Sequence, residues 1–586
     1  MSSIALGLLL CWFSVAQAED HHHAHHPPAA DVSTAVTESP KASDNDTTGA
    51  LVIASDRGFL GNEEIRDTIQ AFTDGSGHDV ELVLVTGDKT KDRLSNAVAA
   101  LRERSHKTIV VLPLFLSDDH PRLALAKSQL NEAKDLIWAK PFGSSYLAAE
   151  VLSDRLAALK DPQKHNTMLV GYGATNAENR AAMQEDLDRL LAHASQDTPL
   201  RSAKSLVWYE YGIEGGDEKR KEVTKDLIKV MFRRGPTAVV PFNMAMKLDS
   251  MMSMNGFMQM HMPKSVQFLQ DEVLPHPAIG TWMSREIQRP TLTMDDLGVV
   301  FLAHGADFDW NETMRHAAAP LAEKYTLEFA FSMADPPVVK RAIDKLEARG
   351  AKAIVVVRVF GMSSSFISGI HRMLGHDIEH AGHGGAHGGG HGHGGGHGHH
   401  GMGNSGPRIR TSAVTATSGG IDDHALFAEA MLSRAKALSK DPAKETIVVV
   451  AHGAGSDARN DHWKKTLSSL AKQMAEQGGT DFRAIHTGTW REDWPDKREV
   501  EVAAIRAHVT EGLKDDGRVI VIPARTTLKG PEDKLLKGLE YTLGSGFAPS
   551  EQFTEWVESH ILKGATQLGL QGNAPTPPNN DSHHHH

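Results

Sequence analysis

The feature that most constrains this chain is a short unit that recurs four times between about residues 50 and 560. Each unit opens with an apolar, mostly β-branched run, continues through a small-residue loop and an amphipathic helix, and later adds a second apolar run. Such runs, alternating with helices, are typical of parallel sheets buried on both faces. The sequence therefore predicts an α/β fold of repeated half-domains with parallel sheets flanked by helices. The runs are 51–53, 109–112, 168–170, 238–240, 299–302, 353–357, 447–450 and 519–522.

The four units are related in pairs. Segment 153–164 (SDRLAALKDPQK) matches segment 433–444 (SRAKALSKDPAK) at an offset of 280 residues. Asn62 of the first unit matches Asn311 of the third at an offset of 249. The difference, 280 − 249 = 31, is the length of a Gly/His-rich tract at 376–406 that interrupts the third unit. We therefore expect two bilobal pairs of half-domains, the second carrying this insert.

The first residues are typical of a signal peptide, because an apolar run ends in the small-residue pattern Ala16-Gln17-Ala18. An ordinary apolar strand is the alternative. Export predicts a periplasmic protein, and no later segment is apolar enough for a membrane span in the mature chain. The expected organisation is a signal peptide at 1–18, a His-rich leader and linker at 19–48, half-domain pairs at 49–290 and 291–562, and a disordered tail at 563–586.

Charge and cysteine content exclude several functions. The formal net charge is −12 with the 34 histidines counted as neutral, and no basic stripe is present to bind phosphates, so we expect no nucleic-acid partner. Cys11 is the only cysteine and lies within the predicted signal peptide. The mature protein is therefore expected to contain no disulfide, no Cys-ligated zinc and no iron–sulfur cluster.

Two histidines stand at corresponding strand ends. Units three and four contain strand–Ala–His–Gly, which places His304 and His452 directly after the first apolar run. Open α/β sheets bind ligands at the carboxyl ends of their strands, and glycine permits the sharp turn that follows. Neutral imidazole suits cobalt, nickel or iron ions. A hydrogen-bonded strand-end histidine is the bland alternative, and its repetition in two units favours a metal ligand.

A second kind of position follows the second apolar run. His371 comes after it in unit three, and His120 comes after it in unit one, where the 249-residue offset places it two residues from His371. Each of these histidines is either a metal ligand or a solvated residue at a helix start.

The strand–His–Gly start, the Pro-Leu-Phe-Leu segment at 113–116 that precedes His120, and the doubled half-domain resemble the CbiX/SirB class II chelatases. The resemblance implies a bilobal fold with a sirohydrochlorin-like tetrapyrrole between the lobes, into which cobalt, nickel or iron is inserted. It makes His304 and His371 the metal-binding and catalytic residues and adds His452 as a ligand.

Other positions depart from that family's pattern. Ser55 and Tyr172 occupy the first-loop histidine position of units one and two, and unit four has Arg525 near the place of a second histidine. The activity is therefore expected in the second pair. These losses, together with export, keep open a second hypothesis: a non-catalytic periplasmic protein that binds or delivers metal.

Acidic residues lie near the predicted site. Asp307 and Asp309 follow His304 on the same loop and are candidate metal-side carboxylates. Asp335 precedes Pro336 and is best interpreted as a helix cap.

The Gly/His tract and the leader supply further candidate ligands. The tract has almost no apolar residues, so it cannot form a core, and flexible imidazoles at high local concentration bind borderline metals. An inert linker is the alternative. Cleavage after Ala18 would place His21 third in the mature chain, where the amine, two amides and imidazole form a square-planar site for Cu²⁺ or Ni²⁺. The tract histidines are His376, His380, His383, His387, His391, His393, His397, His399 and His400.

Deleting residues 376–406 should lower the number of metal ions bound per chain and leave the fold intact, because the tract interrupts an otherwise complete unit. Equilibrium dialysis with metal analysis measures the capacity. A variant that keeps the tract but replaces its nine histidines by asparagine separates imidazole from linker length. A large fall in the Tm of the metal-free deletion would contradict the assignment.

Overall fold

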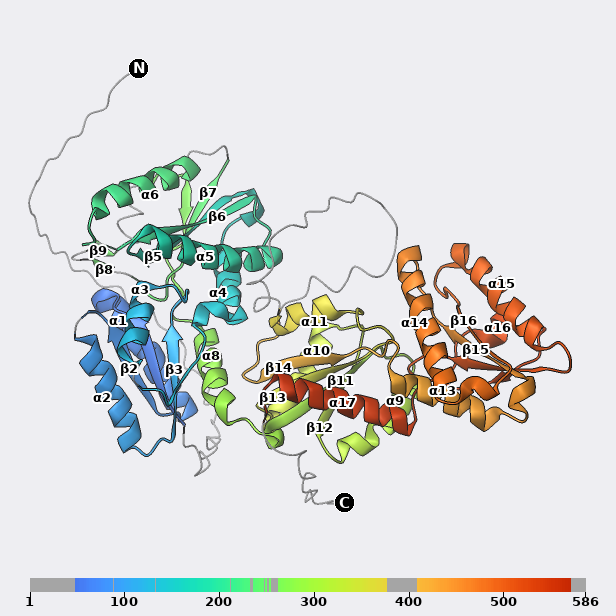
Figure 1. Cartoon of the computed structure of the whole chain (residues 1–586). Coiled ribbons are helices and arrows are strands. Elements are labelled where there is room, and N and C mark those ends of the chain that lie inside the picture. The colour runs from blue at the N-terminus through green and yellow to red at the C-terminus, as the bar shows by residue number, and fades with distance from the viewer. Residues whose placement is uncertain are drawn as a thin grey trace, which may run out of the picture. The chain divides into compact units, whose positions relative to one another are not determined.

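The computed structural model describes most of the chain after residue 47 (Figure 1). The predicted signal peptide, the leader with His21, the tract histidines from His380 to His400 and the tail from residue 571 lie outside the described residues. Within the described part, none of the helices has the length and apolar character that crossing a membrane requires. The described ranges are 48–87, 89–131, 133–210, 212–231, 235–246, 248–249, 252–253, 262–376 and 408–570.

Four separate parallel sheets confirm the predicted repeat. Each has four strands, and in every unit the first and third strands lie side by side at the centre, flanked by the second and the fourth. The eight predicted apolar runs form the two central strands of each sheet, whose buried faces explain their β-branched composition. The sheets are β2-β1-β3-β4, β6-β5-β7-β10, β12-β11-β13-β14 and β16-β15-β17-β18.

The strands have these bounds: β1 Thr48–Ser55, β2 Val80–Val85, β3 Thr108–Leu114, β4 Leu136–Trp138, β5 Asn166–Ala174, β6 Ser202–Tyr209, β7 Thr237–Pro241, β10 Val266–Phe268, β11 Leu297–Ala303, β12 Thr326–Phe331, β13 Ala353–Val359, β14 Val414–Gly419, β15 Glu445–Ala451, β16 Ala484–Thr489, β17 Arg518–Pro523 and β18 Thr542–Leu543. A short antiparallel pair, β8 Leu248–Asp249 and β9 Met252–Ser253, lies outside these sheets.

The helices that cover the sheets are α1 Gly58–Ser76, α2 Thr90–Glu103, α3 Pro121–Gln129, α4 Tyr146–Ala157, α5 Ala177–Asp197, α6 Gly216–Met231, α8 Pro277–Gln288, α9 Phe308–Ala322, α10 Pro336–Ala348, α11 Ile367–Leu374, α13 Ala425–Leu438, α14 Asp457–Glu476, α15 Pro495–Gly512, α16 Glu532–Leu535 and α17 Glu551–Gln567. Helix α17 runs past residue 562, so the second pair extends beyond its predicted boundary.

The two units of each pair exchange a helix. Helix α4 follows the sheet of unit one but packs on α5 of unit two, whereas α8, which follows unit two, packs on β1 and β3. In the second pair α13 packs on α14 and β17, and α17 packs on β13 and β14 of unit three (Figure 1). Each pair consequently shares one apolar core between its two sheets.

The ends of the Gly/His tract meet. The amide of Ile409 donates a hydrogen bond to the carbonyl oxygen of Met373 at 2.7 Å, where α11 ends. Strands β13 and β14, which lie before and after the tract, are adjacent and in continuous register. This arrangement agrees with a segment inserted into a complete unit.

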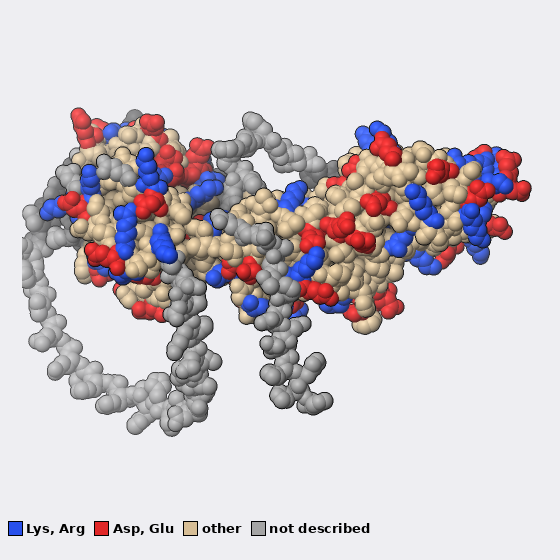
Figure 2. Space-filling model, turned by 60° about the horizontal axis from the view of Figure 1, so that its bottom comes forward, with Lys and Arg blue, Asp and Glu red and all other residues tan. Residues whose placement is uncertain are grey.

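Charged side chains of both signs are interspersed over the face drawn in Figure 2. Basic residues on this face do not gather into one stripe. The absence of a nucleic-acid partner stays a prediction.

Replacing Phe553 by alanine should lower the free energy of unfolding of the second pair by about 3–5 kcal/mol. Phe553 is fully buried on α17 and contacts Phe301 of unit three and Phe547 of unit four, with ring centroids 6.3 and 5.3 Å away. Urea denaturation measures the change, and Leu562→Ala, on the same helix at 43% exposure, is the control. Equal effects of the two substitutions would contradict the exchanged-helix packing.

Candidate functional site

The strand order of each sheet creates a crevice between its first and third strands. The chain leaves these neighbouring strands at the same edge and turns to helices on opposite faces, which is where open α/β sheets bind ligands. Ser55, Tyr172, His304 and His452 occupy equivalent positions at this edge in the four units.

An asparagine from the next helix fixes the strand-end loop in every unit. Its side-chain oxygen accepts a hydrogen bond from a backbone amide of the loop, which holds the loop against the helix start. The sequence revealed the match of Asn62 and Asn311 but not this role. The amide-to-oxygen distances are 2.8 Å for Arg57–Asn62, 3.0 Å for Thr175–Asn179, 3.2 Å for Ala306–Asn311 and 3.3 Å for Ala454–Asn460.

His304 is exposed at the end of β11, and its Nδ1 lies 2.6 Å from the carbonyl oxygen of Gly305. A carbonyl oxygen only accepts, so Nδ1 carries the proton and a neutral ring keeps its lone pair on Nε2. Gly305 has φ +73°, and an added Cβ would lie 2.9 Å from the Cβ of Phe331. Glycine is therefore required for the turn that presents the imidazole.

The carboxylates near His304 have different roles. Asp307 accepts a hydrogen bond from the amide of Trp310 at 2.9 Å and caps α9, so one of its two carboxylate oxygens is bound to the helix. Asp309 is exposed in the first turn of α9. Asp335 stands at the start of α10 as predicted, but its side chain makes no capping hydrogen bond.

His452 repeats the arrangement of His304. Its Nδ1 lies 3.0 Å from the carbonyl oxygen of Gly453, and its Nε2 lies 3.1 Å from Oδ2 of Asp493 and 3.9 Å from Oε2 of Glu492. Arg525, at the place where a second histidine was missing from the sequence, forms an ion pair with Glu492. The crevice of unit four thus joins a half-buried imidazole to two carboxylates.

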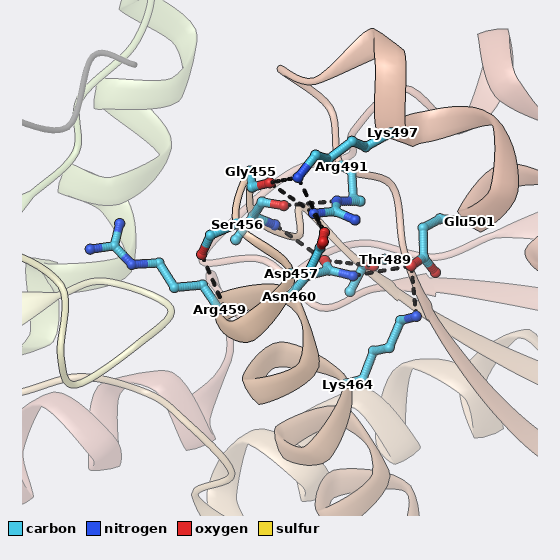
Figure 3. A network of polar contacts seen from close by, with 11 residues as sticks. Gly455, Ser456, Asp457, Arg459, Asn460, Lys464, Thr489, Arg491, Lys497 and Glu501 are labelled. Carbon is cyan, nitrogen blue, oxygen red and sulfur yellow. Dashed lines mark hydrogen bonds and ion pairs between the residues drawn. The ribbon is translucent and has the colours of Figure 1, made fainter. Parts of the chain in front are cut away.

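Charged side chains hold the loop that follows His452 (Figure 3). The buried Arg491 donates from Nη2 to Oδ1 of Asp457 at 2.7 Å, and Lys497 donates to the same oxygen at 3.2 Å. These hydrogen bonds lower the pKa of Asp457. Lys497 also donates to the carbonyl oxygen of Gly455 at 3.0 Å, so one loop is held from two sides.

His371 lies within α11 and pairs with His376. Their Nδ1 atoms are 3.3 Å apart, and Nε2 of His376 is 2.9 Å from Oγ1 of Thr415. Thr415 is in register with Ile354, which pairs with Gly298, whereas His304 follows the carboxyl end of β11. Gly298 and Ala303 are five residues apart in β11, and five residues of an extended strand span about 16 Å. His376 therefore lies toward the opposite edge of the sheet from His304.

The 249-residue offset between units one and three does not extend to the second histidine position. Ala54 pairs with Leu114 and Ala303 with Val359, which gives spacings of 114 − 54 = 60 and 359 − 303 = 56 residues. Unit three is four residues shorter there, so Phe366 takes the helix-cap position that His120 holds in unit one. His371 lies about one turn farther along its helix. The offset alignment that placed it beside the position of His120 is therefore wrong.

His120 is a buried helix cap. Its Nδ1 accepts a hydrogen bond from the amide of Arg122 at 3.2 Å, so the proton of the neutral ring is on Nε2, which faces Gly173. Burial, followed by the charges of Arg57 and Arg122, lowers its pKa to about 3. In this tautomer Nε2 of His120 is a hydrogen-bond donor, and its role as a metal ligand stays a prediction.

A cleft with about 480 Å³ of space outside the atoms lies between the two units of the first pair. It is bordered by the equivalent positions Ser55 and Tyr172 and by His120 and Asn243, which follow the third strands. Among the described residues, no group of three or more His, Cys, Asp or Glu side chains is arranged to hold a metal ion.

Comparisons with known proteins found similarity among solved structures. No family model and no curated protein sequence matches the chain. Among solved structures, it is similar to DR2241 from Deinococcus radiodurans, described as a multi-domain protein with structural similarity to chelatases and two additional novel domains. The TM-score is 0.29 at 13% identity, and the match covers 49% of this chain and 56% of that one.

His120 should make the fold sensitive to acid. Because its folded pKa is about 3 and its ordinary value 6.5, the unfolded chain takes up a proton that the folded chain refuses. Its contribution is complete above pH 6.5 and is lost as the pH falls toward 3, by up to about 1.4 kcal/mol per pH unit. His560, whose pKa burial lowers to about 4, acts in the same direction.

His120→Asn keeps a helix-capping oxygen without a titratable ring. The free energy of unfolding, measured by urea denaturation between pH 6.5 and 4.5, should fall less steeply with acid in this variant than in the parent chain. His316→Asn, at an exposed histidine of α9, is the control. An unchanged slope in His120→Asn would show that His120 is not neutral in the folded protein.

Proposed function

We propose that this protein is a chelatase that inserts cobalt, nickel or iron into a sirohydrochlorin-like tetrapyrrole, and that the second half-domain pair receives the metal. The observation that most directly supports this proposal is the shared geometry of His304 and His452. Both stand at the carboxyl end of a first strand, and both donate from Nδ1 to the following glycine carbonyl. A hydrogen bond of this kind fixes the ring, as it does for metal-bound histidines. In His304 it leaves the lone pair of Nε2 available, whereas Nε2 of His452 donates a proton to Asp493, and an incoming metal ion would replace that proton.

The surroundings of these histidines suit a divalent substrate ion. His304 is exposed, so an ion can reach it from solvent. Asp493 and Glu492 lie within 4 Å of Nε2 of His452 and favour a cation there. In the proposed reaction the macrocycle loses two pyrrole protons as the metal enters. A carboxylate such as Asp493, whose side chain is 70% exposed, accepts one of them, and Glu492 or solvent water accepts the other.

A second function, metal binding or delivery without insertion, is favoured by a different observation. Phe366 holds the helix-cap position of unit three, so the histidine pair that the family resemblance implies is not assembled at one edge of that sheet. A protein with separate strand-end histidines and a histidine-rich insert retains the ability to collect ions. The predicted export to the periplasm fits this function.

His304→Ala and His452→Ala should each abolish or strongly reduce insertion, by about tenfold or more, because a fixed imidazole ligand is lost. The assay combines the full-length chain with sirohydrochlorin and Co²⁺, Ni²⁺ or Fe²⁺, and follows the absorbance of the macrocycle. His316→Ala is the matched control, since His316 is also an exposed histidine of unit three.

Two outcomes separate the hypotheses. Insertion at the uncatalysed rate, with a Co²⁺ affinity that falls in both variants but not in His316→Ala, would leave delivery as the function. Unchanged insertion and unchanged affinity in both variants would refute both.

A further inference from the structure

The cleft of the first pair is lined by apolar side chains and one arginine that have no role in the proposed metal reaction. It lies between two sheets and takes walls from the third-strand loops of both units and from α5. Most of the wall is apolar, formed by residues such as Leu114, Phe115, Leu187 and Phe242. Its two methionines, Met183 and Met244, can adapt to the shape of a guest.

The two pairs differ at a residue that borders this cleft. The 280-residue offset that relates α5 to α14 places Met183 on Trp463. In the second pair the Trp463 ring lies against Gly361, where an added Cβ would be 2.8 Å from the indole. Leu116, after β3, and Gly361, after β13, stand two residues past equivalent strand ends. The larger side chain of the second pair thus lies in the region that corresponds to the wall of the cleft in the first pair.

One positively charged side chain enters the cleft. Arg57 is 4% exposed, donates from Nε to the carbonyl oxygen of Ala245 at 2.9 Å, and lies over the ring of Tyr172 with its Cζ 5.4 Å from the centroid. Its plane and position are therefore fixed. No Asp or Glu is among the described residues that line the cleft.

His120 shapes the same end of the cleft. Its low pKa, which Arg57 helps to lower, keeps the ring neutral at physiological pH. His120 thus adds no charge beside Arg57, and a guanidinium group in the cleft wall favours an anionic guest. Guanidinium groups bind carboxylates with particular strength because two N–H donors match the two oxygens.

We propose that the first half-domain pair is a binding site for a small organic carboxylate with a flat apolar body, held without a metal ion. The carboxylate lies at Arg57, and the apolar body lies between the walls of the two units near Met183. This inference does not depend on the proposed metal reaction, which concerns the second pair.

The test uses the full-length chain and 2-naphthoate, an apolar aromatic carboxylate, with 2-naphthamide as its uncharged counterpart. Calorimetry or ligand-detected NMR should show saturable binding of naphthoate and at least about tenfold weaker binding of the amide. Met183→Trp, which copies the residue of the second pair, should remove naphthoate binding by filling the cleft. Trp463→Met is the matched control and should leave it unchanged.

Arg57→Gln should abolish the preference for the carboxylate over the amide. Because Arg57 also packs inside the fold, the thermal unfolding of this variant is compared with that of the parent, and Met183→Trp provides the test that does not touch it. Naphthoate binding of unchanged affinity in a folded Met183→Trp chain, equal binding of acid and amide by the parent, or no saturable binding would each overturn the proposal. None of these results bears on metal insertion by the second pair.

Discussion

The structure depends on the burial of four parallel sheets on both faces. Their central strands, for example β11 and β13, are almost entirely without contact to solvent, so each face requires a helical cover. No unit supplies that cover alone, because α8 packs on the sheet of unit one and α17 on that of unit three. Exchange of these helices makes each pair one folding unit with a shared core.

The two pairs use one architecture for different chemistry. Equivalent strand ends hold Ser55 and Tyr172 in the first pair but His304 and His452 in the second. The asparagine that anchors the loop recurs in all four units, and a glycine follows the strand-end residue in all but the first, where Asp56 takes its place. The first pair has an apolar cleft with one buried cation, whereas the second presents two oriented imidazoles.

Sequence patterns predicted what depends on local periodicity and on repeated spacing. All eight apolar runs are central strands, and both strand-end histidines occupy their expected positions. The short edge strands β4 and β18, the exchanged helices and the cleft depend on contacts between distant segments, which no local pattern encodes. The prediction for His371 was wrong because unit three is four residues shorter than unit one between its first and third strands. The 31-residue insert lies farther along the same unit, so the two repeat offsets do not reveal this smaller difference. Asp307 was offered as a ligand because its capping bond cannot be distinguished by residue type.

The central claim is that His304 and His452 present Nε2 to a divalent ion. Anomalous diffraction at the cobalt edge, from crystals of the full-length chain soaked in Co²⁺, tests it most directly. The account predicts anomalous peaks about 2.1 Å from Nε2 of both histidines, a typical distance for a metal bound to imidazole. Cobalt found elsewhere in the ordered structure, with neither strand-end histidine in contact with it, would contradict the account.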